Sequence, residues 1–139
     1  YSNVYGPRQD GNGEAGVIPI FATLMQEGKQ PTIYGTGEQK RDFVSVHDVV
    51  KANMLAISHG KQTVYNIGSS VMYSVNQIYD LIKEHTDFAK EALLGAPRPG
   101  DVFEISLDYS KAKRELEWEP EVAFENGLQE TLQYIQAHS

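Results

Sequence analysis

The sequence predicts an α/β fold, and three observations lead to this prediction. Short runs rich in β-branched and aromatic residues alternate with longer segments whose apolar residues recur every three or four positions. This alternation continues to the end of the chain, as it does in α/β proteins. The strand-like runs are few and short, and no G-x-G-x-x-G turn directly joins a buried strand to a helix. A complete doubly wound nucleotide-binding fold is therefore not expected.

Strands are expected at four places. The first run combines Tyr, Val and Tyr, which favour a pleated, half-buried segment, and a Gly-Pro turn ends it. Residues 9–16 follow as a polar, glycine-rich loop. Two short strands flank the next glycine-rich turn, and a compact strand ends at Gly68. The expected strand ranges are 1–5, 32–34, 43–46 and 63–68.

Five helices are expected from the apolar periodicity. Gly28 and Gly60 are expected to end the first and second helices. Ser74 and Gln77 have the spacing of a capping box at the start of the third helix, and Asp108 is a candidate N-cap of the fourth. The expected ranges are 17–28, 47–60, 74–85, 108–118 and 124–138. The apolar faces expected in the core are Val17, Phe21 and Leu24; Val50, Met54 and Ile57; Val75, Ile78 and Ile82; and Phe124, Leu128, Leu132 and Ile135.

Charge and composition exclude several classes of function. The 12 Lys and Arg residues are outnumbered by 19 Asp and Glu residues, which gives a formal net charge of −7. An acidic chain is poorly suited to bind nucleic acid or a membrane surface, because both interactions depend on basic residues. The chain has no cysteine, which fits a cytoplasmic location, and no apolar run approaches the ~20 residues that a membrane span needs.

Three polar clusters interrupt the core-forming pattern and are candidates for a binding site. They are Asn3 near Tyr1, then Tyr34 with Arg41, and then Arg98 with Asp101. Two arginines beside glycine-rich turns suit a phosphate or diphosphate. An aromatic ring can stack on a base, and a carboxylate can accept hydrogen bonds from ribose. Together these residue types indicate a nucleoside diphosphate.

Each cluster also has a purely structural interpretation. Arg41 could form a surface ion pair with Asp42, and Tyr34 could be a packed residue at a strand edge. Arg98 and Asp101 could fasten a turn, and Asn3 could hydrogen-bond the adjacent turn. The four histidines share no ligand spacing, so no metal site is expected. No nucleophile elbow and no acid–base pair is recognised.

Five stretches in one order connect these clusters to a known family: YSNVYGPRQ, PTIYGTGEQKRDFVSVHDVVKAN, VYNIG, RPGD and SKAKRELEWEP. Their succession closely resembles the C-terminal half of the extended short-chain dehydrogenases/reductases. The members most similar are the NAD-dependent nucleotide-sugar epimerases and dehydratases. GEAGV after YGPRQ resembles most closely the UDP-glucose and UDP-N-acetylglucosamine 4-epimerases.

The resemblance implies a small C-terminal substrate-binding domain with a few short strands and four to five helices. Residues 1–16 would be a remnant of the NAD-binding domain, including its trailing strand, with the connecting loop; residues 17–139 would be the substrate-binding domain. The rest of the NAD-binding domain, with its glycine-rich fingerprint and catalytic Tyr-x-x-x-Lys pair, would be missing. Tyr109 and Lys113 match that spacing but resemble part of a peripheral helix. No catalytic residue is therefore expected here, and the chain alone should be inactive.

The resemblance also assigns roles to individual residues. The residues implied for substrate binding are Asn3, Val17, Ile18, Tyr34, Arg41, Arg98 and Asp101. Tyr34 would stack on the uracil, Asn3 and the two arginines would hold the diphosphate, and Asp101 would hold the ribose. Val17 and Ile18 would begin the helix that passes the uracil. Tyr1 would lie near the nicotinamide of NAD.

The implied function is that of the nucleotide-sugar-binding part of a UDP-sugar 4-epimerase, which oxidises C4 of the sugar transiently and then reduces it. A dTDP-glucose 4,6-dehydratase and a non-catalytic nucleotide-sugar-binding module are the alternatives. The implied partners are a UDP-sugar, the missing NAD-binding domain and, in the full-length protein, a second copy in a homodimer. Strand and apolar surface exposed near Tyr1 would promote self-association of the isolated chain.

Overall fold

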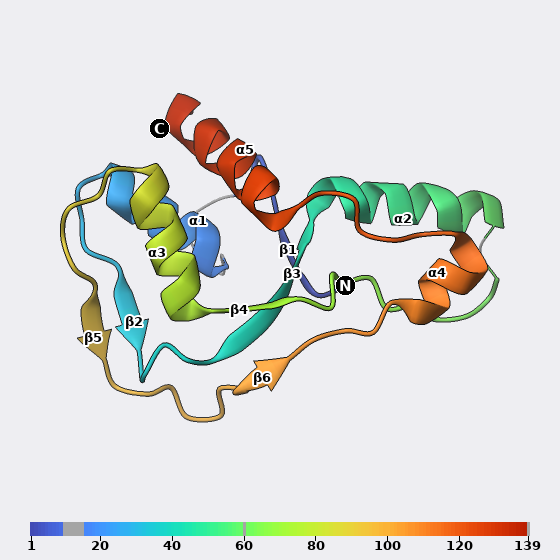
Figure 1. Cartoon of the computed structure of the whole chain (residues 1–139), viewed down its shortest axis with the longest axis horizontal. Helices are drawn as coiled ribbons and strands as arrows, with labels where there is room; N and C mark the ends of the chain where they lie inside the picture. The colour runs from blue at the N-terminus through green and yellow to red at the C-terminus, as the bar shows by residue number, and fades with distance from the viewer. Residues whose placement is uncertain (10–15, 60, 139) are drawn as a thin grey trace.

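The computed structural model describes residues 1–9, 16–59 and 61–138, and it has the predicted α/β architecture (Figure 1). A central four-stranded sheet lies between three helices at one end of the molecule and two at the other. The described strands are β1 (Asn3–Tyr5), β2 (Thr32–Tyr34), β3 (Lys40–Ser45), β4 (Met72–Ser74), β5 (Leu93–Gly95) and β6 (Glu104–Ile105). The described helices are α1 (Val17–Gln26), α2 (Val46–His59), α3 (Val75–His85), α4 (Ser110–Leu116) and α5 (Phe124–Ala137).

Strand β3 organises the central sheet. β1 and β6 pair with it in parallel, and β4 pairs with it in the antiparallel direction. β2 and β5 form a separate parallel pair, in which Tyr34 lies opposite Gly95. The segment 96–103 connects β5 to β6, so it runs from the partner of β2, which carries Tyr34, to the partner of β3, which carries Arg41.

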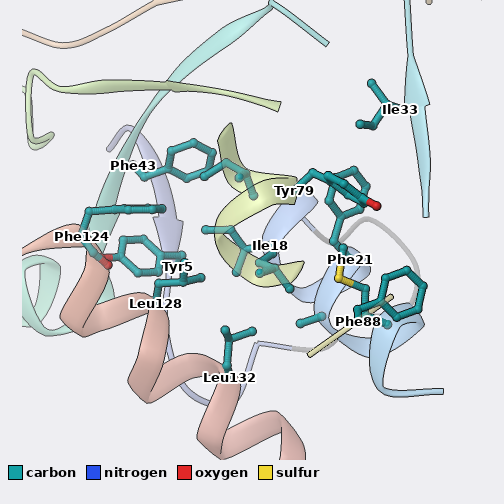
Figure 2. Packing of buried hydrophobic residues seen from close by; sticks show 14 residues of the cluster. Tyr5, Ile18, Phe21, Ile33, Phe43, Tyr79, Phe88, Phe124, Leu128 and Leu132 are labelled. Atoms are coloured by element: carbon teal, nitrogen blue, oxygen red, sulfur yellow. The ribbon is translucent and has the colours of Figure 1, made fainter. Parts of the chain in front are cut away.

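The larger hydrophobic cluster lies between α1, α3, α5 and one face of the β1–β3 pair (Figure 2). Tyr5, Phe43 and Phe124 contact one another in this cluster, with ring centroids 5.1–6.4 Å apart. Ile78 and Ile82 of α3 and Leu128 of α5 are fully buried beside them. These are the residues of α3 and α5 whose periodicity predicts an inward face, so that prediction is confirmed.

A second cluster fills the space between α2, α4 and the opposite face of the same strands. In β3, Phe43 belongs to the first cluster and Val44 to the second. In β1, Tyr5 belongs to the first cluster and Val4 packs against the second. Trp118 is fully buried here and donates its indole N–H to the Asp48 carbonyl at 2.9 Å. The parallel strands β1 and β3 are therefore covered on both faces.

The helix ends follow local chemistry. Ser74 and Gln77 form the predicted capping box at the start of α3, in which each side chain accepts a hydrogen bond from the other residue's backbone N–H. The N-cap position of α4 is Tyr109 rather than the predicted Asp108. The Asp108 carboxylate still accepts a hydrogen bond from the Ser110 N–H at 2.8 Å, which lowers the pKa of Asp108.

Three predictions about elements are wrong. Residues 63–68 form no strand, because the Ser2 N–H to Ile67 carbonyl bond of 2.8 Å is the only ladder-like bond described for them. The predicted inward face of α2 is exposed, since its buried residues are Asp48, Val49 and Ala52. In α1 the buried face is shifted to Ile18, Phe21, Ala22 and Met25, while Val17 and Leu24 stay partly exposed.

Among the described residues, no helix combines the length and apolar character that crossing a bilayer requires. The predicted division of the chain between residues 16 and 17 stays a prediction. β1 and β3, which lie on either side of that division, pair in one sheet.

Candidate functional site

A hollow of about 570 Å³ opens between the start of α1, strands β1, β2 and β3, and the segment 96–101. Its walls include all seven residues predicted for substrate binding: Asn3, Val17, Ile18, Tyr34, Arg41, Arg98 and Asp101. These residues come from four separate stretches of the chain. The fold brings them together because the β2–β5 and β3–β6 pairs place the connecting segment 96–103 beside both Tyr34 and Arg41.

Tyr34 and Arg98 form one side of the hollow. The Arg98 guanidinium carbon lies 4.0 Å from the centroid of the Tyr34 ring, in a cation–π contact. Gly95 lies so close to this ring that a side chain there would collide with it. Tyr34 is 37% exposed, so it is not the packed edge residue of the structural alternative. Its ring is held by neighbours yet remains accessible from the hollow.

The hollow is also lined by an ion pair between Arg41 and Asp101. The Arg41 Nη2 donates to Asp101 Oδ1 at 2.5 Å, and Gln39 Nε2 lies 3.4 Å from Asp101 Oδ2. The predicted alternative, a surface ion pair between Arg41 and Asp42, is wrong. Asp42 is buried and accepts hydrogen bonds from the Ser69, Ser70 and Leu107 backbones instead. The Arg41 side chain is thus directed into the hollow.

Asn3 joins strands β1 and β3 at the wall of the hollow. Its side-chain amide donates to the Asp42 carbonyl of β3 at 2.9 Å, so it is fixed across the β1–β3 pair rather than to the adjacent turn. Val17 and Ile18 stand at the first turn of α1, whose N-terminal end borders the hollow. The first N–H groups of a helix favour an anion. Ile18 itself is 1% exposed and contributes mainly to the core.

Tyr1, the residue predicted near the nicotinamide, lies outside this hollow. It borders a second hollow of about 400 Å³ whose wall also includes Asn3, Arg41 and Asp101. The Tyr1 hydroxyl donates to the Asn53 side-chain carbonyl at 2.5 Å, and the Tyr1 residue is 65% exposed. The two hollows are therefore neighbours that share three polar residues.

The sequence analysis missed several wall residues, among them Gln9 and Gln39. Gln39 had a detectable signal, because it stands two positions before Arg41, and alternate residues of an extended segment share a face. The turn before Gln39 requires glycine at position 37. Gly37 has φ of +73°, and a side chain there would collide with Asn76 and Ile33.

One tyrosine beside the hollow holds its proton strongly. Tyr5 borders the hollow, but burial, with a smaller contribution from the charge of Asp48, raises the pKa of its phenol, so it stays protonated at neutral pH. Tyr109 packs edge-on against Trp118, and Lys113 pairs with Glu119, both away from the hollow. In residues 1–9, 16–59 and 61–138, no group of three or more His, Cys, Asp or Glu side chains could hold a metal ion.

Comparison with known proteins shows which family this α/β chain belongs to. The family model for GDP-mannose 4,6 dehydratase matches residues 1–131. The chain belongs to this family, the NAD-dependent epimerases and dehydratases of the extended short-chain dehydrogenase/reductase group, as predicted. It corresponds to the C-terminal part of its relatives.

Individual relatives give the same result. One relative is the UDP-glucose 4-epimerase of Thermotoga maritima, whose crystal structure contains UDP-glucose. Its sequence is 49% identical to this chain and its structure superposes with a TM-score of 0.97; the match covers 99% of this chain and 45% of the epimerase. The UDP-glucose 4-epimerase of Mycolicibacterium smegmatis is 36% identical, over 99% of this chain and 44% of its own. The dTDP-glucose 4,6-dehydratase of Bacillus anthracis, whose structure was solved with NAD, is 31% identical in sequence and has a TM-score of 0.89. The match covers 98% of this chain and 43% of the dehydratase. The chain thus spans less than half the length of these relatives.

Proposed function

We propose that this chain is the nucleotide-sugar-binding part of an NAD-dependent UDP-sugar 4-epimerase. The observation that carries the proposal is the convergence of Tyr34, Arg41, Arg98 and Asp101 on one hollow. Two guanidinium groups provide charge for a diphosphate, the ring provides a surface for a base, and the carboxylate provides an acceptor for ribose hydroxyls. The similarity to 4-epimerases that act on UDP-sugars supports uracil as the base.

In the proposed complex, both arginines exchange their present partners for the ligand. Arg98 now covers the Tyr34 ring, and Arg41 is paired with Asp101. The diphosphate would draw both guanidinium groups toward its oxygens, which frees the ring for the uracil and the carboxylate for the ribose. Asn3 would add a hydrogen bond to the diphosphate, and Val17 and Ile18 would begin the helix that passes the uracil. The nucleotide would then be held firmly while the sugar stays free to rotate.

The reaction itself would take place in the longer enzyme. NAD bound in that enzyme would supply the hydride chemistry at C4 of the sugar. This chain's contribution would be binding energy from the nucleotide, which positions the reacting carbon. Tyr1 is the residue proposed to approach the nicotinamide, and its exposed ring beside the second hollow is accessible to such a group. The catalytic Tyr-x-x-x-Lys pair is proposed to lie outside this chain.

A 4,6-dehydratase is the second candidate, because the dTDP-glucose 4,6-dehydratases are also relatives. The higher identity to a UDP-glucose 4-epimerase, 49% against 31%, favours the epimerase. A catalytic acidic residue in the NAD-binding part would decide in favour of the dehydratase. A cytoplasmic location also remains part of this proposal.

The test is a pair of calorimetric titrations of the 139-residue chain. We expect UDP-glucose to bind, with an affinity that falls as salt is raised, because charge pairing to a diphosphate is screened. NAD is expected to give no binding, and the chain alone should not epimerise UDP-glucose. A chain that binds NAD but not UDP-glucose would overturn the proposal.

A further inference from the structure

Asp42, which follows Arg41 in β3, is a buried carboxylate that is only 1% exposed. Its Oδ1 accepts hydrogen bonds from the N–H and the hydroxyl of Ser69, both at 2.8 Å. Its Oδ2 accepts from the N–H groups of Ser70 at 3.2 Å and Leu107 at 3.0 Å. A buried carboxylate needs such donors, because burial removes its hydration. The Asp42 carboxylate therefore joins β3 to two loops that are distant in sequence.

One of these loops is the segment 96–106, which forms part of the wall of the hollow. All of its residues are exposed, so the hydrophobic core gives this segment little support. Its hydrogen bonds to β3 include the Lys40 N–H to Phe103 carbonyl bond of 2.7 Å, and β6 has only two residues in register with β3. The bond from Leu107 to Asp42 comes directly after this short pairing and ends on a buried group. The position of the segment thus depends on Asp42.

The other loop, residues 68–70, is shaped around the same carboxylate. Ser70 has φ of +61°, in the left-handed region that residues other than glycine seldom adopt. From this conformation its N–H reaches Asp42, and its hydroxyl donates to the Leu107 carbonyl at 2.7 Å. A side chain at Gly68 would place its Cβ 2.6 Å from Asp42 Oδ2. Both backbone polar groups of Leu107 are therefore held, one by the carboxylate and one by this loop.

The backbone of Asp42 fixes a further residue of the hollow. Its carbonyl accepts the side-chain amide of Asn3 at 2.9 Å. The Ser2 N–H, one residue earlier, donates at 2.8 Å to the carbonyl of Ile67, which precedes the loop 68–70. Asn3 and the segment 96–106 thus have a common support at Asp42.

We infer that Asp42 is a positioning residue of the nucleotide site. Its carboxylate would hold the segment that carries Arg98 and Asp101, and its carbonyl would orient Asn3. Asp42 would not touch the nucleotide and would act through these three residues. The inference rests on the proposed function for the identity of the ligand, but the support of the segment can be measured without any ligand.

Asp42→Asn tests the inference, because it keeps the size of the side chain and turns one acceptor oxygen into an NH₂ donor that faces a backbone N–H. Asp48→Asn is the matched control. Asp48 is 3% exposed, and its carboxylate accepts the N–H groups of Glu121 and Val122. It is not among the residues that line the two hollows. Both variants are compared well below their unfolding temperatures, so that only folded protein is measured.

The ligand-free readout is hydrogen exchange at the Lys40 N–H, which bonds to Phe103 and not to Asp42. We expect this exchange to be about tenfold faster in Asp42→Asn than in Asp48→Asn, because the segment loses a charged hydrogen bond that holds it locally. The second readout is calorimetric titration with UDP. Its affinity should fall about tenfold in Asp42→Asn and stay within about twofold in Asp48→Asn.

Equal exchange at Lys40 in the two variants would overturn the inference, and so would equal UDP affinities. If the unsubstituted chain binds no UDP, the proposed function fails, and the exchange rates alone then decide whether Asp42 holds the segment. The two failures are thus distinguishable.

A milder variant covers the case in which Asp42→Asn does not fold. Ser69→Ala removes the hydroxyl from Asp42 Oδ1 and leaves the three backbone N–H bonds to the carboxylate in place. It should speed the Lys40 exchange and weaken UDP binding by about threefold each. Ser58→Ala, which removes a hydroxyl bonded to carbonyls within α2, should change neither. A Ser69→Ala variant that behaves like Ser58→Ala in both measurements would contradict the inference.

Discussion

At the scale of single residues, Tyr34 is the side chain proposed to stack on the base, and its neighbours hold its ring in place. Gly95 allows the close approach of the neighbouring strand to its ring, and Arg98 lies over the ring at 4.0 Å. A base that replaces the guanidinium would gain a rigid stacking surface, and only the arginine would need to move. The residue type was evident from the sequence. The contact with Arg98 was not, because 64 positions separate the two residues.

Replacing the Tyr34 ring tests this role. Tyr34→Ala should weaken the binding of UDP by at least about fivefold, because stacking of a base on an aromatic side chain contributes roughly 1–3 kcal/mol. Tyr34→Phe keeps the ring and should bind within about threefold of the unsubstituted chain. Calorimetric titration with UDP measures both variants. Equal affinities for the Ala and Phe variants would exclude Tyr34 as the stacking residue.

Tyr5 makes a prediction about pH. Burial is the main cause that raises its pKa, so the folded chain holds the phenolic proton to higher pH than the unfolded chain, which loses it near pH 10. The stabilisation is complete below that pH and is lost as pH rises above it. Between pH 8 and pH 11 the free energy of unfolding should fall by about 1.4 kcal/mol more in the unsubstituted chain than in Tyr5→Phe. Urea unfolding at the two pH values measures the difference, and parallel losses in both proteins would contradict it.

At the scale of elements, local sequence signals predicted where the helices lie. Tertiary contacts determine which helix faces are buried and where the short strands form. The capping residues of α3 act within one turn of chain, so sequence spacing was sufficient to find them. In α2, Val49 and Ala52 enter the core while Val50, Met54 and Ile57 face outward. Periodicity detects an apolar face but cannot tell which neighbour covers it. Strands β4, β5 and β6 have only two or three residues, and each depends on a partner strand that is distant in sequence.

The capping box of α3 makes a prediction at this scale. Ser74→Ala should lower the free energy of unfolding by about 1 kcal/mol, because a backbone N–H at the helix start loses its acceptor. Ser58→Ala, whose hydroxyl bonds carbonyls within α2 on an exposed surface, is the control and should change stability by less than about 0.5 kcal/mol. Chemical unfolding of the two variants measures both changes in the free energy of unfolding. Similar losses in both would show that the capping box adds nothing specific.

At the scale of the whole molecule, the hollow results from the way in which two small sheets are connected. The β2–β5 pair holds Tyr34, the β3–β6 pair holds Arg41, and the segment between β5 and β6 carries Arg98 and Asp101 past both. The residue types and their order could be predicted from the sequence, as could the family. The ion pair of Arg41 with Asp101 could not, because Asp42 is the nearer acidic residue in sequence and its burial follows from backbone bonds at residues 69, 70 and 107.

The central claim is that this hollow holds the diphosphate of a nucleotide, and the UDP affinity of Arg98→Ala tests it most directly. Arg114→Ala is the matched control, because Arg114 lies on α4, away from the hollow, and contacts its own helix. A charged hydrogen bond contributes about 1.5–3 kcal/mol, so Arg98→Ala should weaken the binding of UDP by about tenfold or more. Arg114→Ala should leave it within about twofold. An unchanged UDP affinity in Arg98→Ala would contradict the account.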